Sequence, residues 1–248
     1  MSTTYETGHA KNVANFETLI SFIVGYGAAY NPTKITIHLG NMQAQAKKAK
    51  DAIASINSLL PAYSNAVALR EIAFEPISKL STRLFNSLKA TDTPQQIIDN
   101  AETHHRKLQG RRASAKVTEA EKQTLLAEGK VVNQVSASQQ SYDSVLDTLD
   151  KQIKLLASIP EYVPNEIELK IVTLSALYND LKAKNASVVK QTTPLSNSRI
   201  ARNEIMYAKE TGMVATALDA KTYVKALFGV SSPQFKQISG LVISQIKV

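Results

Sequence analysis

The chain has 248 residues, of which 44% are apolar and 20% charged, and its formal net charge is +8. This composition is typical of a globular protein and excludes a disordered chain, while the absence of cysteine excludes disulfides and thiolate metal sites. Nine glycines and eight prolines are few for this length and favour helices over sheets. The positive charge would favour acidic partners if it gathered on one face, but most lysines are interspersed with acidic residues.

The first half of the chain predicts four helices, because large apolar residues recur at intervals of three and four. Their expected ranges are 10–30, 40–60, 64–90 and 92–108. Pro61 is expected to mark the turn of a hairpin between the second and third helices, and Pro76 to break the third. Gly25 and Gly27 favour close packing of the first helix on a neighbour over the approach of a ligand or membrane. Residues 35–39 alternate in polarity, as in a strand, although an irregular lead into the next helix fits equally well.

A short basic segment, residues 111–117, follows Gly110 and is interpreted as a linker. It overlaps the densest group of positive charges in the chain, whose members include Arg106, Lys107, Arg111 and Arg112. These residues could contact an anion such as a phosphate, but the group contains no aromatic residue for base stacking. The chain is therefore expected to divide into helical hairpin regions at 1–110 and 118–248, which can also pack as a single domain.

The clearest pattern in the second half is a helical hairpin from Ser141 to Asn185. Each arm carries five large side chains along one seam: Tyr142, Leu146, Leu149, Ile153 and Leu156 in the first arm, and Ile167, Ile171, Leu174, Tyr178 and Leu181 in the second. Pro160 and Pro164 are expected to end the first arm, and Asn165 to cap the second. The two seams predict that the arms pack against each other in antiparallel fashion.

The two predicted hairpins share a pattern that favours a tandem duplication. The segment Pro61–Tyr63 matches Pro160–Tyr162, and Leu84–Ala90 closely matches Leu177–Ala183. The order of helix, proline–tyrosine turn and second helix is the same in both. A duplicated hairpin leaves this kind of internal repeat behind.

The C-terminal part of the chain predicts two shorter helices, a short turn of helix that starts at Ser231–Pro233, and one strand. The helices are expected at 195–207 and 214–229. Pro194 should kink or end the preceding helix, and Arg199 and Arg202 should be exposed. Residues 241–246 are apolar and β-branched, and could form a strand beside residues 35–39. The predicted fold class is therefore all-α, an elongated bundle of long antiparallel helical hairpins with at most a minor β element near the C-terminus.

The sequence contains no phosphate-binding loop, dinucleotide fingerprint, metalloprotease helix or nucleophile elbow. Glu102 and His105 have the spacing of a di-iron ligand pair, but a di-iron site needs a second such pair. The other match, Glu6 and His9, lies in a glycine-containing terminus that is not expected to be helical. We therefore predict no catalytic site, no metal and no cofactor, and expect that the protein is not an enzyme.

Apolar residues away from the seams indicate a function in assembly. They are Val145, Leu155, Val172 and Val189. A single hairpin cannot cover them, so either the other hairpin or another copy of the chain must do so. We expect a non-enzymatic structural protein that self-associates through its amphipathic helices into a filament or oligomer.

Two other classes of function stay open. A membrane-active helical bundle of the pore-forming type would use the apolar run Leu19–Ala29, which is too short to span a bilayer. An electrostatic nucleic-acid binder would use the basic group around Arg111, and an anionic membrane could be bound by the same charge. No signal peptide is evident, so the expected location is cytoplasmic by default.

Four segments resemble those of a family of bacterial proteins of about this length that is predicted to be helical throughout. They are Gly8–Phe16, Gly25–Pro32, Ser196–Glu204 and Ser232–Ser239. The resemblance extends along the whole chain and implies one all-helical bacterial protein. No activity is assigned to that family, so the resemblance implies no catalytic or binding residue.

Overall fold

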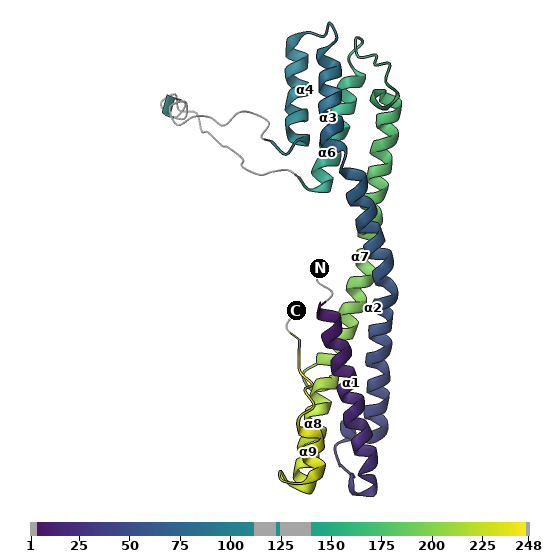
Figure 1. The fold of residues 1–248 in the computed structure, drawn as a ribbon, viewed down its shortest axis with the longest axis vertical. Helices are drawn as coiled ribbons and strands as arrows, with labels where there is room; N and C mark the ends of the chain where they lie inside the picture. The colour runs from purple at the N-terminus through teal and green to yellow at the C-terminus, as the bar shows by residue number, and fades with distance from the viewer. Residues whose placement is uncertain (1–3, 112–122, 125–139, 247–248) are drawn as a thin grey trace. The chain divides into compact units, whose positions relative to one another are not determined.

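The computed structural model describes residues 4–111, 123–124 and 140–246, and these residues are mostly α-helical (Figure 1). The helices are α1 (Thr4–Gly25), α2 (Leu39–Phe74), α3 (Ile77–Lys89), α4 (Gln95–Leu108), α6 (Tyr142–Ala157), α7 (Ile171–Tyr207), α8 (Met213–Phe228) and α9 (Pro233–Ser239). Short 3₁₀ helices are η1 (Gly27–Ala29), η2 (Ile35–Ile37) and η3 (Ile167–Leu169). No strand occurs among the described residues, so the prediction of an all-α fold is confirmed and a β element is not required.

The chain divides into two compact units. Unit 1 contains residues 1–63 and 191–248, and unit 2 contains residues 64–190. The chain passes from unit 1 into unit 2 within α2 and returns within α7, because each of these helices is long enough to contribute to two cores. The basic segment at 111–117, where the sequence predicted a boundary, lies almost entirely outside the described residues, so the linker stays a prediction.

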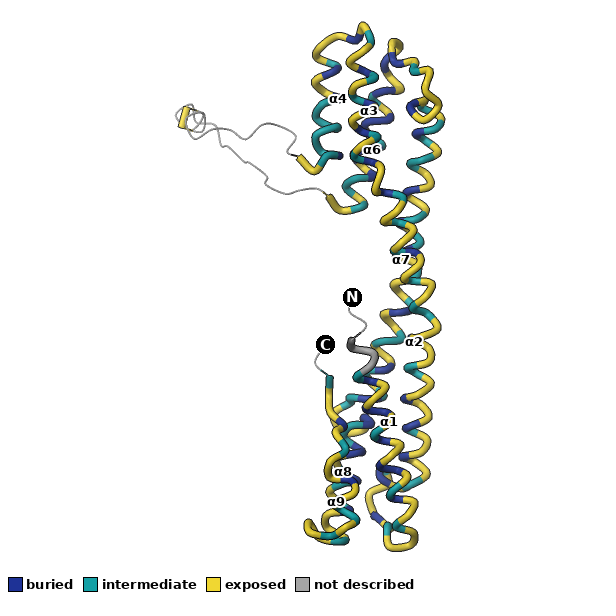
Figure 2. The backbone as a smooth tube through the Cα atoms, viewed as in Figure 1, coloured by how far each residue is buried: buried dark blue, intermediate teal, exposed yellow. Residues whose placement is uncertain are grey.

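Unit 1 is built on a hairpin of α1 and the first part of α2, covered by the last part of α7 and by α8 and α9 (Figure 1). Its most buried large side chains are Phe16, Leu19, Ile23, Met42 and Met206. Four residues of the apolar stripe expected in the first helix are buried, namely Val13, Phe16, Ile20 and Ile23. The helix spans Thr4–Gly25 instead of 10–30, so Tyr30, expected in the same stripe, lies beyond its end. The expectation that the terminus with Glu6 and His9 is not helical is wrong, because α1 begins at Thr4. Figure 2 shows buried positions in dark blue recurring between exposed positions along the helices of this unit.

Unit 2 packs α3, α4 and α6 with the last part of α2 and the first part of α7. Its most buried large side chains are Leu84, Leu88, Leu149, Leu156, Leu174 and Leu181. The predicted antiparallel hairpin of α6 and α7 is confirmed, and the residues of both seams are buried or partly buried except Ile167. Ile167 is 72% exposed because α7 begins at Ile171, six residues after the predicted cap Asn165.

The hairpin predicted at Pro61 is wrong. Helix α2 continues through Pro61, and α7 likewise continues through Pro194. Pro61–Tyr63 is therefore helical, whereas Pro160–Tyr162 lies in the turn after α6, so the matched segments do not mark a duplicated hairpin. An interior proline costs about 3 kcal/mol through a lost hydrogen bond and a steric clash, and packing along a long helix can offset that cost. Pro76 does break the helix, since α2 ends at Phe74 and α3 begins at Ile77.

Both predicted strand segments adopt other structures. Residues 35–37 form the 3₁₀ helix η2, and residues 241–246 are extended without pairing to a strand. The prediction for Gly25 is also wrong, because a side chain there would meet nothing within 4 Å. Gly27 has a φ of 58°, so it permits the turn after α1 instead of close helix packing. Arg202 was expected to be exposed but is 3% exposed, with its guanidinium donating to Asn203 Oδ1 at 2.9 Å.

Serine side chains cap the starts of two helices, and a glycine ends a third. Ser141 Oγ accepts a hydrogen bond from Ser144 N at 3.2 Å and so caps α6. Ser232 Oγ caps α9 in the same way, with Phe235 N as the donor at 3.1 Å. Gly229 ends α8 with a φ of 88°, which favours glycine at that position.

Candidate functional site

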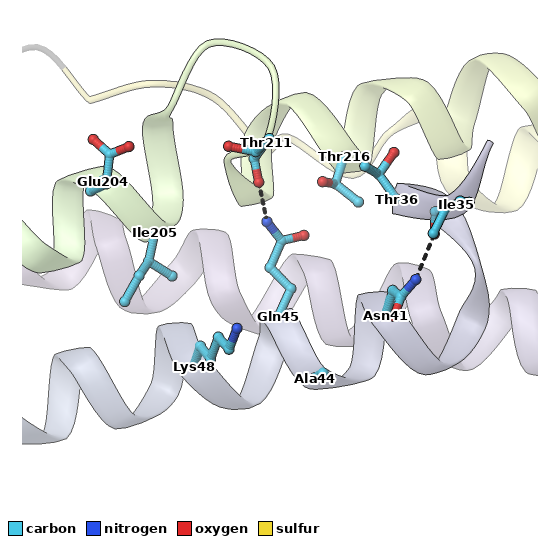
Figure 3. A pocket seen from close by; sticks show the side chains of 10 residues that line it. All are labelled: Ile35, Thr36, Asn41, Ala44, Gln45, Lys48, Glu204, Ile205, Thr211 and Thr216. Carbon is cyan, nitrogen blue, oxygen red and sulfur yellow. Dashed lines mark hydrogen bonds between the residues drawn. The ribbon is translucent and has the colours of Figure 1, made fainter.

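A groove of about 450 Å³ in unit 1 lies beside η2, the first turns of α2 and the connection from α7 to α8, and more of its surface is apolar than polar (Figure 3). Its polar lining residues are Thr36, Asn41, Gln45, Lys48, Glu204, Thr211 and Thr216. Amide and hydroxyl groups predominate, with one ammonium and one carboxylate among them. A groove of this kind can bind a small polar molecule through a few placed hydrogen bonds.

Two side-chain amides of the groove hold neighbouring loops against α2. Asn41 Nδ2 donates to Ile35 O at 2.7 Å, and Gln45 Nε2 donates to Thr211 O at 2.6 Å (Figure 3). These donors are therefore used within the fold. Thr36 Oγ1 is buried and has no hydrogen-bond partner among the described residues. Because this hydroxyl is buried, a molecule in the groove would meet the side chains of Lys48 and Glu204 instead.

The lining of the groove is poor in catalytic groups. It contains no imidazole and a single carboxylate, so it offers no pair of carboxylates and no histidine for acid–base work. Within the described ranges, no group of three His, Cys, Asp or Glu residues could hold a metal ion. The side chains of the groove do not indicate a particular reaction.

Glu102 and His105, which have the spacing of a di-iron ligand pair, lie on α4, where both side chains make contacts within the fold. His105 Nδ1 lies 2.9 Å from Ser81 Oγ, and its ring stacks on Phe85 with 4.9 Å between the ring centroids. Glu102 Oε1 lies 3.9 Å from Arg106 Nη1. The ring of His105 therefore faces α3, and the spacing of the pair is explained by helix packing.

Two neighbouring histidines of α4 face the two helices against which α4 packs. His105 faces α3, while the charges of Lys151 and Asp147 on α6 act on the ring of His104. Burial lowers the pKa of His104, and nearby lysines add to this effect. Burial also lowers the pKa of His105, and the charge of Arg111 acts in the same direction. Both rings therefore favour the neutral form in the folded protein.

Three of the four residues predicted to contact an anion lie at or just beyond the C-terminal end of α4, namely Arg106, Lys107 and Arg111; Arg112 lies outside the described residues. Arg106 O accepts from Arg111 N at 2.8 Å, and Lys107 O accepts from Gln140 Nε2 at 3.0 Å. Positive side chains at this end of a helix also complement its dipole. Their position has a structural reason, and contact with nucleic acid or an anionic membrane stays a prediction.

The four residues predicted to mediate self-association occupy different environments. Val145 and Leu155 are partly buried and pack against the core of unit 2. Val172 and Val189, both on α7, are 81% and 62% exposed. They are 17 positions apart, so their side chains point about 100° away from each other around the helix axis. The four residues therefore do not form one stripe.

Two exposed apolar residues at the turn between α6 and α7, Val163 and Ile167, were not among those predicted to mediate self-association. Val163 and Ile167 are 79% and 72% exposed, and with Val172 they make up what we call the turn cluster. Tyr162 Oη donates to Leu169 O at 3.1 Å and closes the turn, and burial raises the pKa of Tyr162 to about 12. Apolar residues beside two prolines were the available signal, but the expected helix start assigned Ile167 to the core.

No described helix is both long enough and apolar enough to cross a membrane. Comparisons with family models, with curated proteins and with solved structures found no match to the chain. This result is consistent with the resemblance to a bacterial family that has no assigned activity. Function is therefore inferred from the side chains of the described residues alone.

Proposed function

We propose that this protein is a non-enzymatic assembly protein and that its copies associate through the turn cluster of unit 2. The observation that carries the proposal is the exposure of three large apolar side chains within ten residues, at 79% for Val163, 72% for Ile167 and 81% for Val172. Single exposed apolar residues are normal on protein surfaces, whereas groups of them are typical of contact surfaces.

The turn that carries the cluster is well anchored. Ile159 and Leu169 are 5% and 4% exposed and hold the two ends of the turn in the core of unit 2. Arg83 Nη2 lies 3.0 Å from Glu168 Oε1 and joins the turn to α3. Because these contacts order the backbone before any partner binds, association loses less conformational entropy than it would with an unstructured loop.

The size of the cluster sets the strength of the contact. Burying one valine or isoleucine side chain contributes about 1.5–3 kcal/mol. Association costs about 4–15 kcal/mol because two molecules lose translational and rotational freedom. Three side chains therefore support a weak, reversible contact between two copies. A stable oligomer or filament would need additional apolar surface.

Sedimentation velocity of a triple variant tests the proposal. Val163→Ser, Ile167→Ser and Val172→Ser together remove the apolar surface, and because each side chain is more than 70% exposed the fold should be kept. The variant is expected to sediment as a monomer where the unmodified protein forms heavier species. Val230→Ser, at a valine of unit 1 that is 62% exposed, is the matched control and is expected to leave association unchanged.

Far-ultraviolet circular dichroism establishes that the triple variant keeps its helices. If the folded variant and the unmodified protein show the same distribution of species, the turn cluster does not carry the association. If Val230→Ser reduces association as much as the triple variant does, the loss of any exposed apolar side chain is enough to reduce it. The assignment of association to the turn cluster would then be wrong.

A further inference from the structure

An extended segment of unit 1, residues 241–246, lies along α1 without forming a strand (Figure 1). The backbone groups of such a segment need partners from elsewhere. Ser244 N donates to Asn12 Oδ1 at 3.3 Å, and Ser244 O accepts from Asn12 Nδ2 at 2.6 Å. Asn15 Nδ2 donates to Val242 O at 2.7 Å. Two asparagines of α1 therefore take the place of a neighbouring strand.

The spacing of these asparagines matches the spacing of the backbone groups that they bind. Asn12 and Asn15 are three positions apart and so lie on one face of α1. Val242 and Ser244 are two positions apart, so their backbone groups point to the same side of an extended chain. A side-chain amide has the same donor and acceptor as a peptide group, which lets Asn12 bind both groups of one residue.

Apolar side chains add selectivity to this backbone contact. Ile243 is 6% exposed and belongs to the core of unit 1. Ile246 lies against Gly8, where a Cβ atom would be only 2.7 Å from Ile246 Cδ1. Glycine at this position of α1 therefore makes room for a large apolar side chain. The site fits an extended peptide with apolar residues three positions apart.

We infer that this face of α1 is a docking site for the extended segment and that the segment exchanges between two copies of the chain. Gly240 joins the segment to α9, and glycine has the backbone freedom that a change of direction there requires. A second copy presents the same Asn12, Asn15 and Gly8, so each contact within one chain can form between two chains without a new surface. This inference concerns the self-association of the proposed function but uses a surface separate from the turn cluster.

Cysteine cross-linking of the full chain tests the exchange. The chain contains no cysteine, so an engineered pair reports on one contact only. Protein with Gly8→Cys is mixed with protein carrying Ile246→Cys, incubated and mildly oxidised. A Cβ at position 8 would lie 3.7 Å from Ile246 Cγ1, the atom whose place a cysteine sulfur would take, so the two sulfurs would be close to each other. The expected product is a disulfide-linked pair of 27.0 kDa chains. Mass spectrometry of the digested product is expected to show that the disulfide joins positions 8 and 246.

Two further substitutions in the Gly8→Cys chain separate docking from random collision. Asn15→Ala removes the hydrogen bond to Val242 O and is expected to lower the yield of linked pairs severalfold. Thr18→Ala, one turn further along α1, removes a hydroxyl that donates to Ala14 O in its own helix, and the yield should stay the same. Equal yields with both substitutions would contradict docking through the asparagines.

A single chain with both cysteines shows whether the segment docks within its own chain. If that chain closes its internal disulfide but the mixture yields no linked pair above the unmixed preparations, exchange is wrong. The mixture is repeated with Val163→Ser, Ile167→Ser and Val172→Ser in both chains. If the linked pair still forms, exchange of the segment is supported even if the turn cluster does not mediate association. If the linked pair no longer forms, the exchange depends on the turn cluster, which contradicts the inference of a separate surface.

Discussion

Replacing Gln152 by methionine is expected to stabilise unit 2. Gln152 lies on α6 and is 1% exposed, and neither Oε1 nor Nε2 has a hydrogen-bond partner among the described residues. Burying an amide without a partner costs about 1–3 kcal/mol in proteins. Methionine has a similar length and a flexible apolar side chain, so Gln152→Met is expected to raise the free energy of unfolding by about 1–3 kcal/mol.

The assay is guanidinium-induced unfolding followed by far-ultraviolet circular dichroism. Hydrogen exchange of peptides from α6 assigns the effect to unit 2, because two units need not unfold together. Gln96→Met, at an exposed glutamine of α4, is the matched control and is expected to change stability by less than about 0.5 kcal/mol. If Gln152→Met instead destabilises the protein by about 1 kcal/mol or more, the amide is hydrogen-bonded in the folded state and the reasoning is refuted.

Other substitutions test the packing of both units. Leu174→Ala removes a side chain that is 0% exposed and is expected to cost about 2–5 kcal/mol; an unchanged unfolding midpoint would mean that α7 is packed differently. Gly212→Ala places a Cβ 2.5 Å from a backbone nitrogen and should lower the melting temperature, whereas Gly40→Ala meets nothing within 4 Å and should not. Folding lowers the pKa values of His104 and His105, so below about pH 6.5 the unfolded chain binds more protons than the folded protein. The contribution of the two histidines to the free energy of unfolding is therefore complete above about pH 6.5 and is lost as the pH falls below it. Unfolding midpoints between about pH 7.5 and 5.5 measure this loss, which should shrink when both histidines are replaced by glutamine; an equal loss in that variant would contradict the assignment.

The hairpin of α6 and α7 shows what the sequence can predict. Leu149 on α6 and Leu174 on α7 were placed in the core from their spacing alone, and they are 1% and 0% exposed. The prediction succeeds because the helical period determines which side chains share a face, and one apolar face per helix must be buried. The start of α7 was predicted less well, and with it the exposure of Ile167.

Prolines show where local sequence is insufficient. Pro61 and Pro160 are each followed two positions later by tyrosine, yet the first lies inside α2 and the second in a turn. The local penalty of a proline is similar in both places, so the packing of residues on either side decides whether the helix continues. Pro160 is followed by a second proline, Pro164, which adds to the penalty on a continuous helix.

The contacts between α1 and the extended segment were not predicted from the sequence. Asn12 and Ser244 are separated by 232 positions, and no local pattern indicates that the side chain of one binds the backbone of the other. The same holds for Arg202, whose burial depends on its position within unit 1 and not on the polarity of its neighbours. Contacts of this kind are set by tertiary packing, which the periodicity of a single segment does not contain.

Sedimentation velocity of the unmodified protein over a series of concentrations and salt concentrations tests self-association most directly. Association through apolar side chains predicts species heavier than 27.0 kDa that increase with concentration and persist at high salt, because salt does not screen apolar contacts. A single 27.0 kDa species at every concentration and salt would contradict self-association as the function of this protein.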